Sequence, residues 1–131
     1  MGTTTEGTDM IKRNPDTFLP LTPLWFNILL AIAGEPRHGY AIIKEIEHRT
    51  RGGMSPATGT VYLALQRLLE DGLIAETAPA DTGAKHSGRK RRIYELTSLG
   101  KRVTSLEAQR VALQLGVAFE KRLADPSVLD T

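Results

Sequence analysis

The sequence predicts a mostly α-helical protein with one small β-hairpin, which is an α+β fold. Apolar residues recur at helical spacing in four segments, and glycine or proline follows each of the first three. Two short alternating runs come after the third segment, with a long polar loop between them. The fourth segment is much longer than the others.

Length and composition favour a single domain without a membrane span. The chain has 131 residues and no cysteine, so it has no disulfide, thiolate metal site or thiol nucleophile. No apolar run reaches the roughly 18 residues of a transmembrane helix, and the first residues do not resemble a signal peptide. We therefore expect a cytoplasmic protein.

Positive charge is concentrated in one short segment. The formal net charge is only +2, from 17 basic and 15 acidic residues. Five of the basic residues lie between Lys85 and Arg92, where there is no acid. The rest of the chain therefore has 12 basic and 15 acidic residues. This asymmetry is typical of nucleic-acid binding, with a solvated run of charge as the alternative.

Residues 1–17 are polar, which predicts a mobile N-terminal arm. A buried helix follows, because Thr22 can cap it, Pro23 suits its first turn and residues 24–33 are almost all apolar. Trp25 and Phe26 are large for such a helix. They are candidates for lining a pocket for a flat ligand, although core packing or a subunit interface is the simpler interpretation.

A second helix is predicted over residues 39–49, between the breaks at Pro36 and at Gly52-Gly53. His38 and His48 lie at its two ends. Neither has a third ligand at a useful spacing, so we expect no metal site and assign His38 a capping or packing role.

The third helix is predicted to begin at Ser55, as its N-cap, and to end at Gly72 in a left-handed conformation. Its apolar face consists of Val61, Leu65, Leu68 and Leu69. The opposite face, with Tyr62 at its edge, consists of Gly59, Thr60, Leu63, Gln66 and Arg67. Such a slim, uncharged first turn suits a DNA major groove, although an ordinary amphipathic surface helix has a similar pattern.

Two strands are predicted at residues 73–77 and 91–96, and the segment between them contains proline, glycine and the basic cluster. The sequence therefore predicts a β-hairpin with a cationic tip. Arg92 lies at the start of the second strand, where it can pair with an acid across the hairpin.

Thr97 is predicted to cap a final helix from Ser98 to about Ala124, which would be about 40 Å long. Asp125 and Pro126 end it, and the last residues are expected to fray. Apolar residues at helical spacing on this helix are Leu99, Val103, Leu106, Leu113 and Val117. The preceding domain is too small to cover them, so we expect them to pack against a second copy of the chain.

The order of the elements predicts a winged helix-turn-helix with a long C-terminal dimerisation helix. The second and third helices are joined by a short turn that contains glycine, and the hairpin follows as the wing. In this division one helix reads base edges and the wing holds the DNA backbone. The expected regions are the arm at 1–17, the DNA-binding domain at 18–97, and the dimerisation helix and tail at 98–131.

Four motifs resemble those of PadR-type transcriptional regulators, in the same order and spacing. They are His38-Gly39-Tyr40, TGTVY (58–62), LLEDGLI (68–74) and GRKRRIYELT (88–97). The resemblance implies a homodimeric repressor of the short subfamily, with a single C-terminal helix and an inverted-repeat operator. It also implies, in some members, release by a small aromatic or drug-like molecule. Leu63 departs from the family pattern, because many members have proline there.

Individual roles follow from position and from this resemblance. Thr60, Gln66 and Arg67 are candidates for contacts in the groove, with Gln66 suited to adenine and Arg67 to guanine or phosphate. The family motif implies a phosphate contact through the Tyr62 hydroxyl. The wing residues expected to bind phosphates are Lys85, Arg89, Lys90 and Arg91.

We expect neither catalysis nor a cofactor. The chain has no Gly-x-Ser-x-Gly elbow and no phosphate-binding glycine loop, and its three histidines are scattered. A second interpretation of the fold is a winged-helix module that binds an acidic protein, or that binds DNA without sequence preference.

Overall fold

The computed structural model describes residues 14–77 and 92–130, and every structural statement below concerns these residues. The elements, with η for a 3-10 helix, are η1 (Pro15–Phe18), α2 (Pro23–Ala33), β1 (Arg37–His38), α3 (Gly39–Arg49), α4 (Thr58–Glu70), β2 (Ile74–Thr77), β3 (Ile93–Leu96), α5 (Ser98–Glu120) and η2 (Pro126–Leu129). The predicted fold class, mostly α with a small antiparallel sheet, is confirmed.

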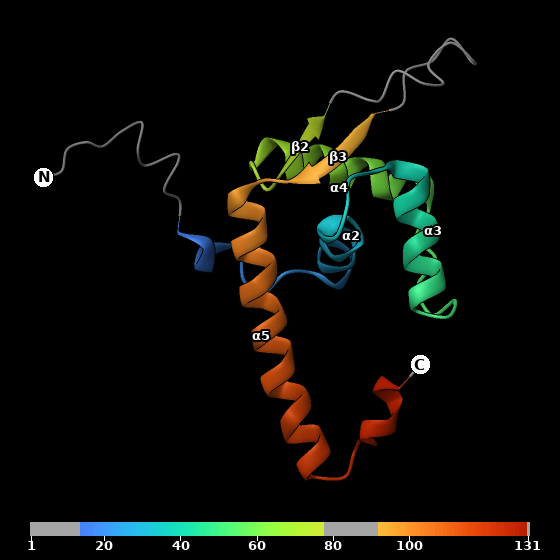
Figure 1. The fold of residues 1–131 in the computed structure, drawn as a ribbon, viewed down its shortest axis with the longest axis vertical. Helices are drawn as coiled ribbons and strands as arrows, with labels where there is room; N and C mark the ends of the chain where they lie inside the picture. The colour runs from blue at the N-terminus through green and yellow to red at the C-terminus, as the bar shows by residue number, and fades with distance from the viewer. Residues whose placement is uncertain (1–13, 78–91, 131) are drawn as a thin grey trace, which may run out of the picture.

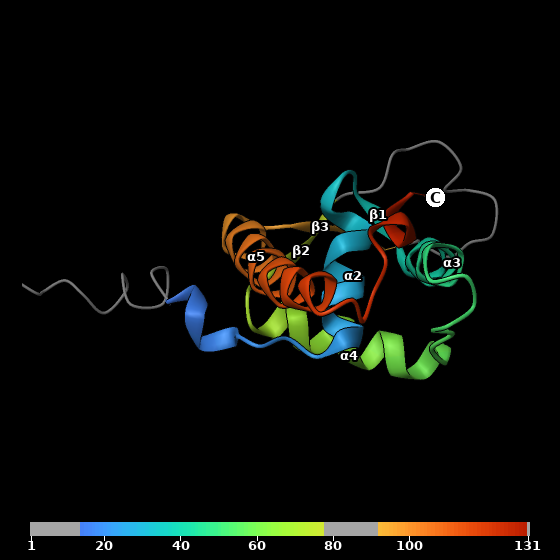
Figure 2. The same cartoon turned by 90° about the horizontal axis from the view of Figure 1, so that it is seen from below.

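Helix α2 forms the centre of the core. Figure 1 shows α2 between α3 and α5, with α4 and the sheet across one end. In the view from below, α3 and α5 are seen almost end-on while α4 is seen lengthwise, so α4 crosses both (Figure 2). Because α2 is apolar on most sides, other elements can pack around it. The largest fully buried apolar side chains are Ile28, Leu29, Ile42, Ile46, Val61, Leu65, Leu68, Leu73 and Val103.

Local capping explains where the first two α-helices begin. Thr22 Oγ1 accepts a hydrogen bond from the Trp25 N–H at 3.1 Å, and Pro23 occupies the first turn, both as predicted. His38 Nδ1 accepts a hydrogen bond from the Ala41 N–H at 3.3 Å, so the capping role of His38 is confirmed.

Helix α4 begins two residues later than a Ser55 cap would place it, so the prediction of a Ser55 cap is wrong. Its N-cap is Ala57, which makes no side-chain capping hydrogen bond, and Thr58 is its first residue. The Ser55 hydroxyl instead donates a hydrogen bond to Glu47 Oε2 on α3, at 3.0 Å. The end of the helix is as predicted, because Gly72 has the positive φ of a left-handed residue, +81°.

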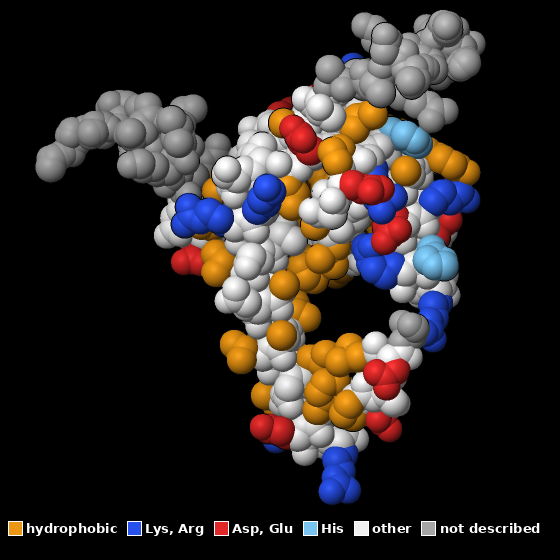
Figure 3. All heavy atoms as spheres, in the orientation of Figure 1, with side chains coloured by type: hydrophobic (Ala, Val, Ile, Leu, Met, Phe, Trp, Pro, Cys, Tyr) orange, Lys and Arg blue, Asp and Glu red, His pale blue; other side chains and the backbone are white. Residues whose placement is uncertain are grey.

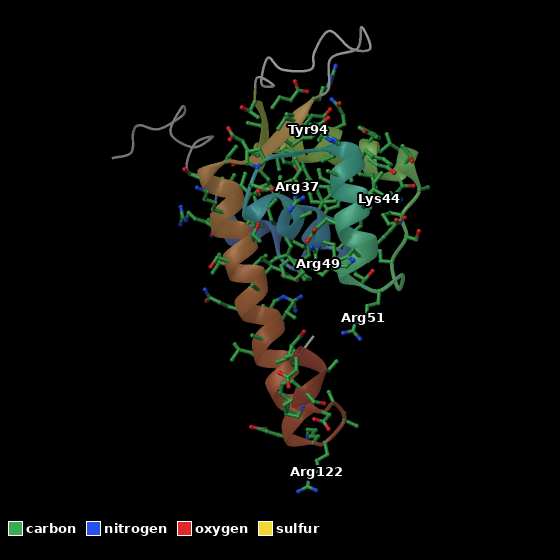
Figure 4. All side chains as sticks on the ribbon, turned by 45° about the vertical axis from the view of Figure 1, so that its right-hand side comes forward. Arg37, Lys44, Arg49, Arg51, Tyr94 and Arg122 are labelled. Carbon is green, nitrogen blue, oxygen red and sulfur yellow. The ribbon has the colours of Figure 1, made fainter. Side chains whose placement is uncertain are left out.

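The predicted two-stranded hairpin is part of a three-stranded sheet with the order β1-β3-β2. Strand β1 pairs antiparallel with β3, with Arg37 opposite Tyr94. Two residues are too few to show alternation, so no sequence pattern indicated β1. Tyr94 is buried in the central strand (Figure 4), and burial raises the pKa of its hydroxyl.

Charged side chains join α2 to β1 and to α3. Arg37 Nε donates a hydrogen bond to the Ala31 carbonyl at the end of α2, at 2.7 Å. Arg49 Nη2 donates to the Asn27 carbonyl at 3.1 Å, and its Nη1 lies 2.9 Å from Glu45 Oε2. Figure 4 shows both arginines between the two helices. The Ala31 carbonyl lies in the last turn of α2, where the helix offers it no partner. The Asn27 carbonyl accepts the bond from Arg49 in addition to the hydrogen bond within the helix.

Residues at the start of the described chain, which the sequence assigned to a mobile arm, form η1. Pro15 is buried, and η1 lies against α5. A hydrogen bond from the Asp16 N–H to Asn14 Oδ1, 2.9 Å long, caps this short helix. The boundary predicted at residue 17 therefore falls inside a helical turn that is packed on the domain.

The end of α5 also differs from the prediction. The helix ends at Glu120 rather than near Ala124, and Arg122 follows it in a left-handed conformation with φ 60°. The tail does not simply fray, because Asp125 Oδ1 accepts a hydrogen bond from the Ser127 N–H at 2.9 Å and so caps η2.

The first turn of α5 lies directly on the chain that leaves α4. The Thr97 hydroxyl donates a hydrogen bond to the Gly72 carbonyl at 2.6 Å and accepts one from the Gly100 N–H at 3.0 Å. The Thr97 N–H donates to the Leu73 carbonyl at 3.1 Å. A Cβ on Gly100 would overlap that same carbonyl oxygen, so only glycine allows this approach.

Helix α5 also buries a carboxylate, Glu107, that forms an ion pair with the partly exposed Arg110, and the sequence did not reveal this pair. Glu107 is 2% exposed, and Arg110 binds both of its carboxylate oxygens, at 2.7 and 3.0 Å. The hydrogen bonds from Arg110, with a further one from the Leu21 backbone, hold the pKa of Glu107 below its usual value despite burial. The carboxylate thus fastens the segment before α2 to α5.

We predict that Gly100→Ala destabilises the protein by about 1–3 kcal/mol, because the added methyl group overpacks the Leu73 carbonyl. Gly34→Ala is the control: Gly34 has a right-handed helical backbone, and a Cβ there meets nothing within 4 Å, so its unfolding free energy should be unchanged or slightly higher. Urea unfolding measures both. Equal stability of the two variants would show that α5 does not need the close approach.

Candidate nucleic-acid interface

Large apolar side chains that remain exposed in the described part of the chain form two groups. The first, on α3 and α4, consists of Tyr40, Tyr62 and Leu63. The second, on the far half of α5 and the C-terminal segment, consists of Leu113, Val117, Leu123, Val128 and Leu129. Clustered exposure of this kind marks surfaces that bind a partner.

Helix α4 has the two faces that the sequence predicts. Val61, Leu65 and Leu68 are buried against the core. On the other side Thr60, Gln66 and Arg67 are all exposed. The candidate groove residues therefore share the outer side of one helix, and they extend from its first turn to its last.

Tyr62 lies at the contact between α3 and α4. A Cβ on Gly39, the first residue of α3, would overlap the Tyr62 ring and hydroxyl, so the ring rests directly on the α3 backbone. The Tyr62 side chain is nevertheless 43% exposed. Tyr62 is therefore held against α3 while part of the residue remains exposed.

Tyr40 and Lys44 extend this surface onto α3, and sequence reasoning did not select them. Tyr40 is 61% exposed, and Lys44 Nζ lies 5.3 Å from the centre of its ring. The Tyr40 hydroxyl and then the Glu47 carboxylate raise the pKa of Lys44, which stays protonated at neutral pH. Their spacing of four residues, which places both on one side of a helix, was the available signal.

An acid lies among the candidate residues at the far end of α4. Gln66 Nε2 is 3.4 Å from Glu70 Oε2, and Arg67 Nε is 3.9 Å from Glu70 Oε1. These exposed contacts are weak, so a stronger acceptor can replace Glu70 at little cost. The first turn of α4 contains no acid.

The wing is only partly within the described residues. Arg92 Nη1 lies 3.1 Å from Glu76 Oε2 on the neighbouring strand, which confirms the predicted pair across the hairpin. The four basic residues predicted to bind phosphates, Lys85, Arg89, Lys90 and Arg91, lie outside the described residues.

The predicted dimerisation residues do not form one exposed face. Val103 is 0% exposed and belongs to the core of its own chain, so it cannot contact a second copy here; Leu99 also packs against that core. The reason is that α2 and η1 already cover the first half of α5. Leu113 and Val117, by contrast, are 76% and 47% exposed, and Leu106 is intermediate.

The far half of α5 extends beyond the rest of the domain (Figure 1). Figure 3 shows apolar side chains gathered on this part of the helix and on the C-terminal segment beside it. Arg122 points away from the molecule at the end of this projection (Figure 4).

Trp25 and Phe26 are both partly buried and pack against the core. Core packing therefore accounts for both side chains, and a role in binding a ligand remains a prediction. Within residues 14–77 and 92–130, no three histidine or acidic side chains gather as metal ligands would. No helix in these ranges has both the length and the apolar character to cross a membrane.

Comparison with known proteins adds family information to this geometry. Residues 28–106 match the model of the transcriptional regulator PadR-like family. An uncharacterised protein of Lysinibacillus sphaericus is 38% identical over 74 residues, which make up 56% of this chain and 64% of that protein.

Solved structures show the same fold. A PadR family transcription regulator from Clostridium difficile R20291 aligns with a TM-score of 0.63 and 26% identity, over 79% of this chain and all of that one. Bacillus subtilis PadR in complex with operator DNA aligns with a TM-score of 0.56 and 21% identity, over 66% of this chain and 46% of that one. The predicted winged-helix fold is thereby confirmed.

We predict an energetic coupling between Gly39 and Tyr62. Gly39→Ala should destabilise the protein by about 1–3 kcal/mol, because the methyl group displaces the Tyr62 ring. In a Tyr62→Ala background the same substitution should cost much less, since the space is then vacant. Urea unfolding of the four proteins gives the coupling energy, and strict additivity would show that the ring does not rest on Gly39.

Proposed function

Because this chain belongs to the PadR-like family of transcriptional regulators, we propose that it is a homodimeric repressor that binds an inverted-repeat operator in double-stranded DNA. The observation that carries this proposal is the outer face of α4. It presents Thr60, Gln66 and Arg67 to solvent from the helix that follows the turn after α3. A helix in that position is the one that enters the major groove.

In this proposal, some of the described residues contact base edges and others contact phosphates. Thr60 lies in the first turn of α4, where recognition helices approach bases. Gln66 and Arg67 would give up their contacts with Glu70 and bind acceptors on the DNA instead. The Tyr62 hydroxyl and the Lys44 ammonium group lie toward α3, the helix that crosses the DNA backbone, and bind phosphates. The basic residues from Lys85 to Arg91, which lie outside the described residues, are proposed to bind phosphates as well.

A DNA-bound structure of a protein with this fold supports the proposal. Bacillus subtilis PadR was solved with operator DNA, and 66% of this chain aligns with it. The acid-free first turn of α4 and the basic wing segment are properties of this chain's own residues that agree with the same use.

The second copy of the chain supplies the second half-site. The far half of α5 leaves Leu113 and Val117 exposed, and the adjoining segment leaves Leu123, Val128 and Leu129 exposed. Together they offer an apolar surface that a two-fold related copy can cover with its own. Burying it removes the cost of exposing these side chains to water.

A small aromatic or drug-like molecule is the proposed effector, and it would release the repressor from DNA. Trp25 is the single tryptophan of the chain, beside Phe26 on α2, the helix that contacts both α3 and α5. A flat ligand stacked there would change the packing between the helix-turn-helix and α5. Quenching of tryptophan fluorescence reports such binding directly.

Selection of bound duplexes from a random pool at about physiological salt tests the function. We expect enrichment of an inverted repeat. Binding without enrichment would contradict specific regulation and would favour the second candidate, non-specific DNA or protein contacts through the basic wing segment.

Tyr62→Phe tests the phosphate contact while keeping the ring on Gly39. We expect roughly 10- to 100-fold weaker binding, as for loss of one hydrogen bond to a charged group, and the same factor on operator and random DNA. Fluorescence anisotropy measures the affinity, and circular dichroism checks the fold. An unchanged affinity would remove Tyr62 from the interface.

The dimer can be tested by placing charge on the exposed part of α5. The double variant Leu113→Glu/Val117→Glu should be monomeric in light scattering at micromolar concentration, because it would bury four carboxylates in the interface. Ala108→Glu is the control, since Ala108 is exposed and lies about 140° around the helix from Leu113. A monomeric parent protein, or a dimeric double variant, would contradict this interface.

A further inference from the structure

Leu63 is a large aliphatic residue on the outer side of α4, and its side chain is 71% exposed. It lies one turn after Gly59 and Thr60 and one turn before Arg67, so hydrogen-bonding side chains surround it. The chain's own core makes no use of it. Exposure of a leucine at the centre of a polar face indicates an apolar partner at that point.

Gly59 gives a second, independent observation on the same side of the helix. A Cβ added at Gly59 meets nothing within 4 Å, and its backbone is not left-handed. Neither packing nor conformation therefore requires glycine there, although glycine weakens a helix relative to alanine. The absence of a side chain at Gly59 therefore leaves room for a molecule that approaches α4 closely from outside.

The chemistry of the major groove identifies what Leu63 would meet. Base edges there present hydrogen-bond donors and acceptors, and the one apolar group is the C5 methyl of thymine. A leucine placed against any other edge would desolvate polar atoms without replacing their hydrogen bonds. Leu63 is thus suited to one base out of four.

We propose that Leu63 reads a thymine in each half-site by contact with its C5 methyl group, and that Gly59 lets the α4 backbone approach closely enough for that contact. This inference rests on the proposed function, because it requires α4 in the major groove. Leu63 would then contribute to the sequence specificity of α4 without forming a hydrogen bond. This contact also gives a role to the position at which this sequence has leucine where PadR-type regulators often have proline.

Replacement of single thymines by deoxyuridine tests the contact, because only the methyl group is removed. On the selected operator, we expect one position per half-site at which the wild-type protein loses about fourfold in affinity, the value for one methyl group. Leu63→Ala should bind the parent operator more weakly and lose nothing further at that position. At every other thymine the two proteins should respond alike, which provides the internal control.

Gly59→Ala separates folding from binding. The substitution should raise the folding equilibrium constant about two- to fivefold, because alanine favours a helix. It should also weaken operator binding at least fivefold, since the methyl group keeps α4 from the base edges. Variants that bind like the wild type, or a Leu63→Ala protein with an unchanged response to deoxyuridine at every position, would overturn the proposal while leaving specific binding intact. A protein that enriches no sequence would overturn both.

Discussion

The contact between the first turn of α5 and the chain leaving α4 links the two surfaces of this protein. Gly72 ends α4 in a left-handed conformation, and Leu73 follows it into the sheet. Thr97 binds both of their carbonyls, and Gly100 has no side chain to hold α5 away. The helix proposed to pair two copies is therefore bonded directly to the end of the helix proposed to enter DNA.

This arrangement explains how exposed apolar side chains are distributed. The first half of α5 packs on α2 and η1, and it contains the buried residues Val103 and Glu107. The second half is less covered, and Leu113 and Val117 remain exposed on it. On the opposite side of the domain, α3 and α4 expose aromatic and aliphatic groups among polar ones. One core thus supports two surfaces with exposed apolar side chains.

Sequence reasoning succeeded where the determining contacts are local. Thr22, His38 and Thr97 cap helices by bonds to residues three positions away, and Gly72 takes its positive φ within the same turn. The buried face of α4 followed from helical periodicity alone. The Arg92–Glu76 pair was also predictable, because the two strands of a hairpin bring their ends together.

The failures involve contacts between residues far apart in the chain. Ser55 has the chemistry of a cap, but Glu47 on α3 takes its hydroxyl. Strand β1 exists because β3 pairs with it, and Val103 is buried because α2 and η1 lie over it. The contact between Tyr62 and Gly39 likewise depends on how α3 packs against α4. No periodicity or composition contains this information.

Helix α5 is proposed to hold two α4 helices at a set separation, and a spacing series of operators tests this most directly. Base pairs are inserted between the half-sites of the selected repeat, and affinity is measured for each duplex. A rigid dimer predicts one sharp optimum and a loss of specific binding when about five base pairs rotate one half-site to the far side of the helix. Equal affinity at all spacings would contradict the claim and would show that the two DNA-binding domains move independently.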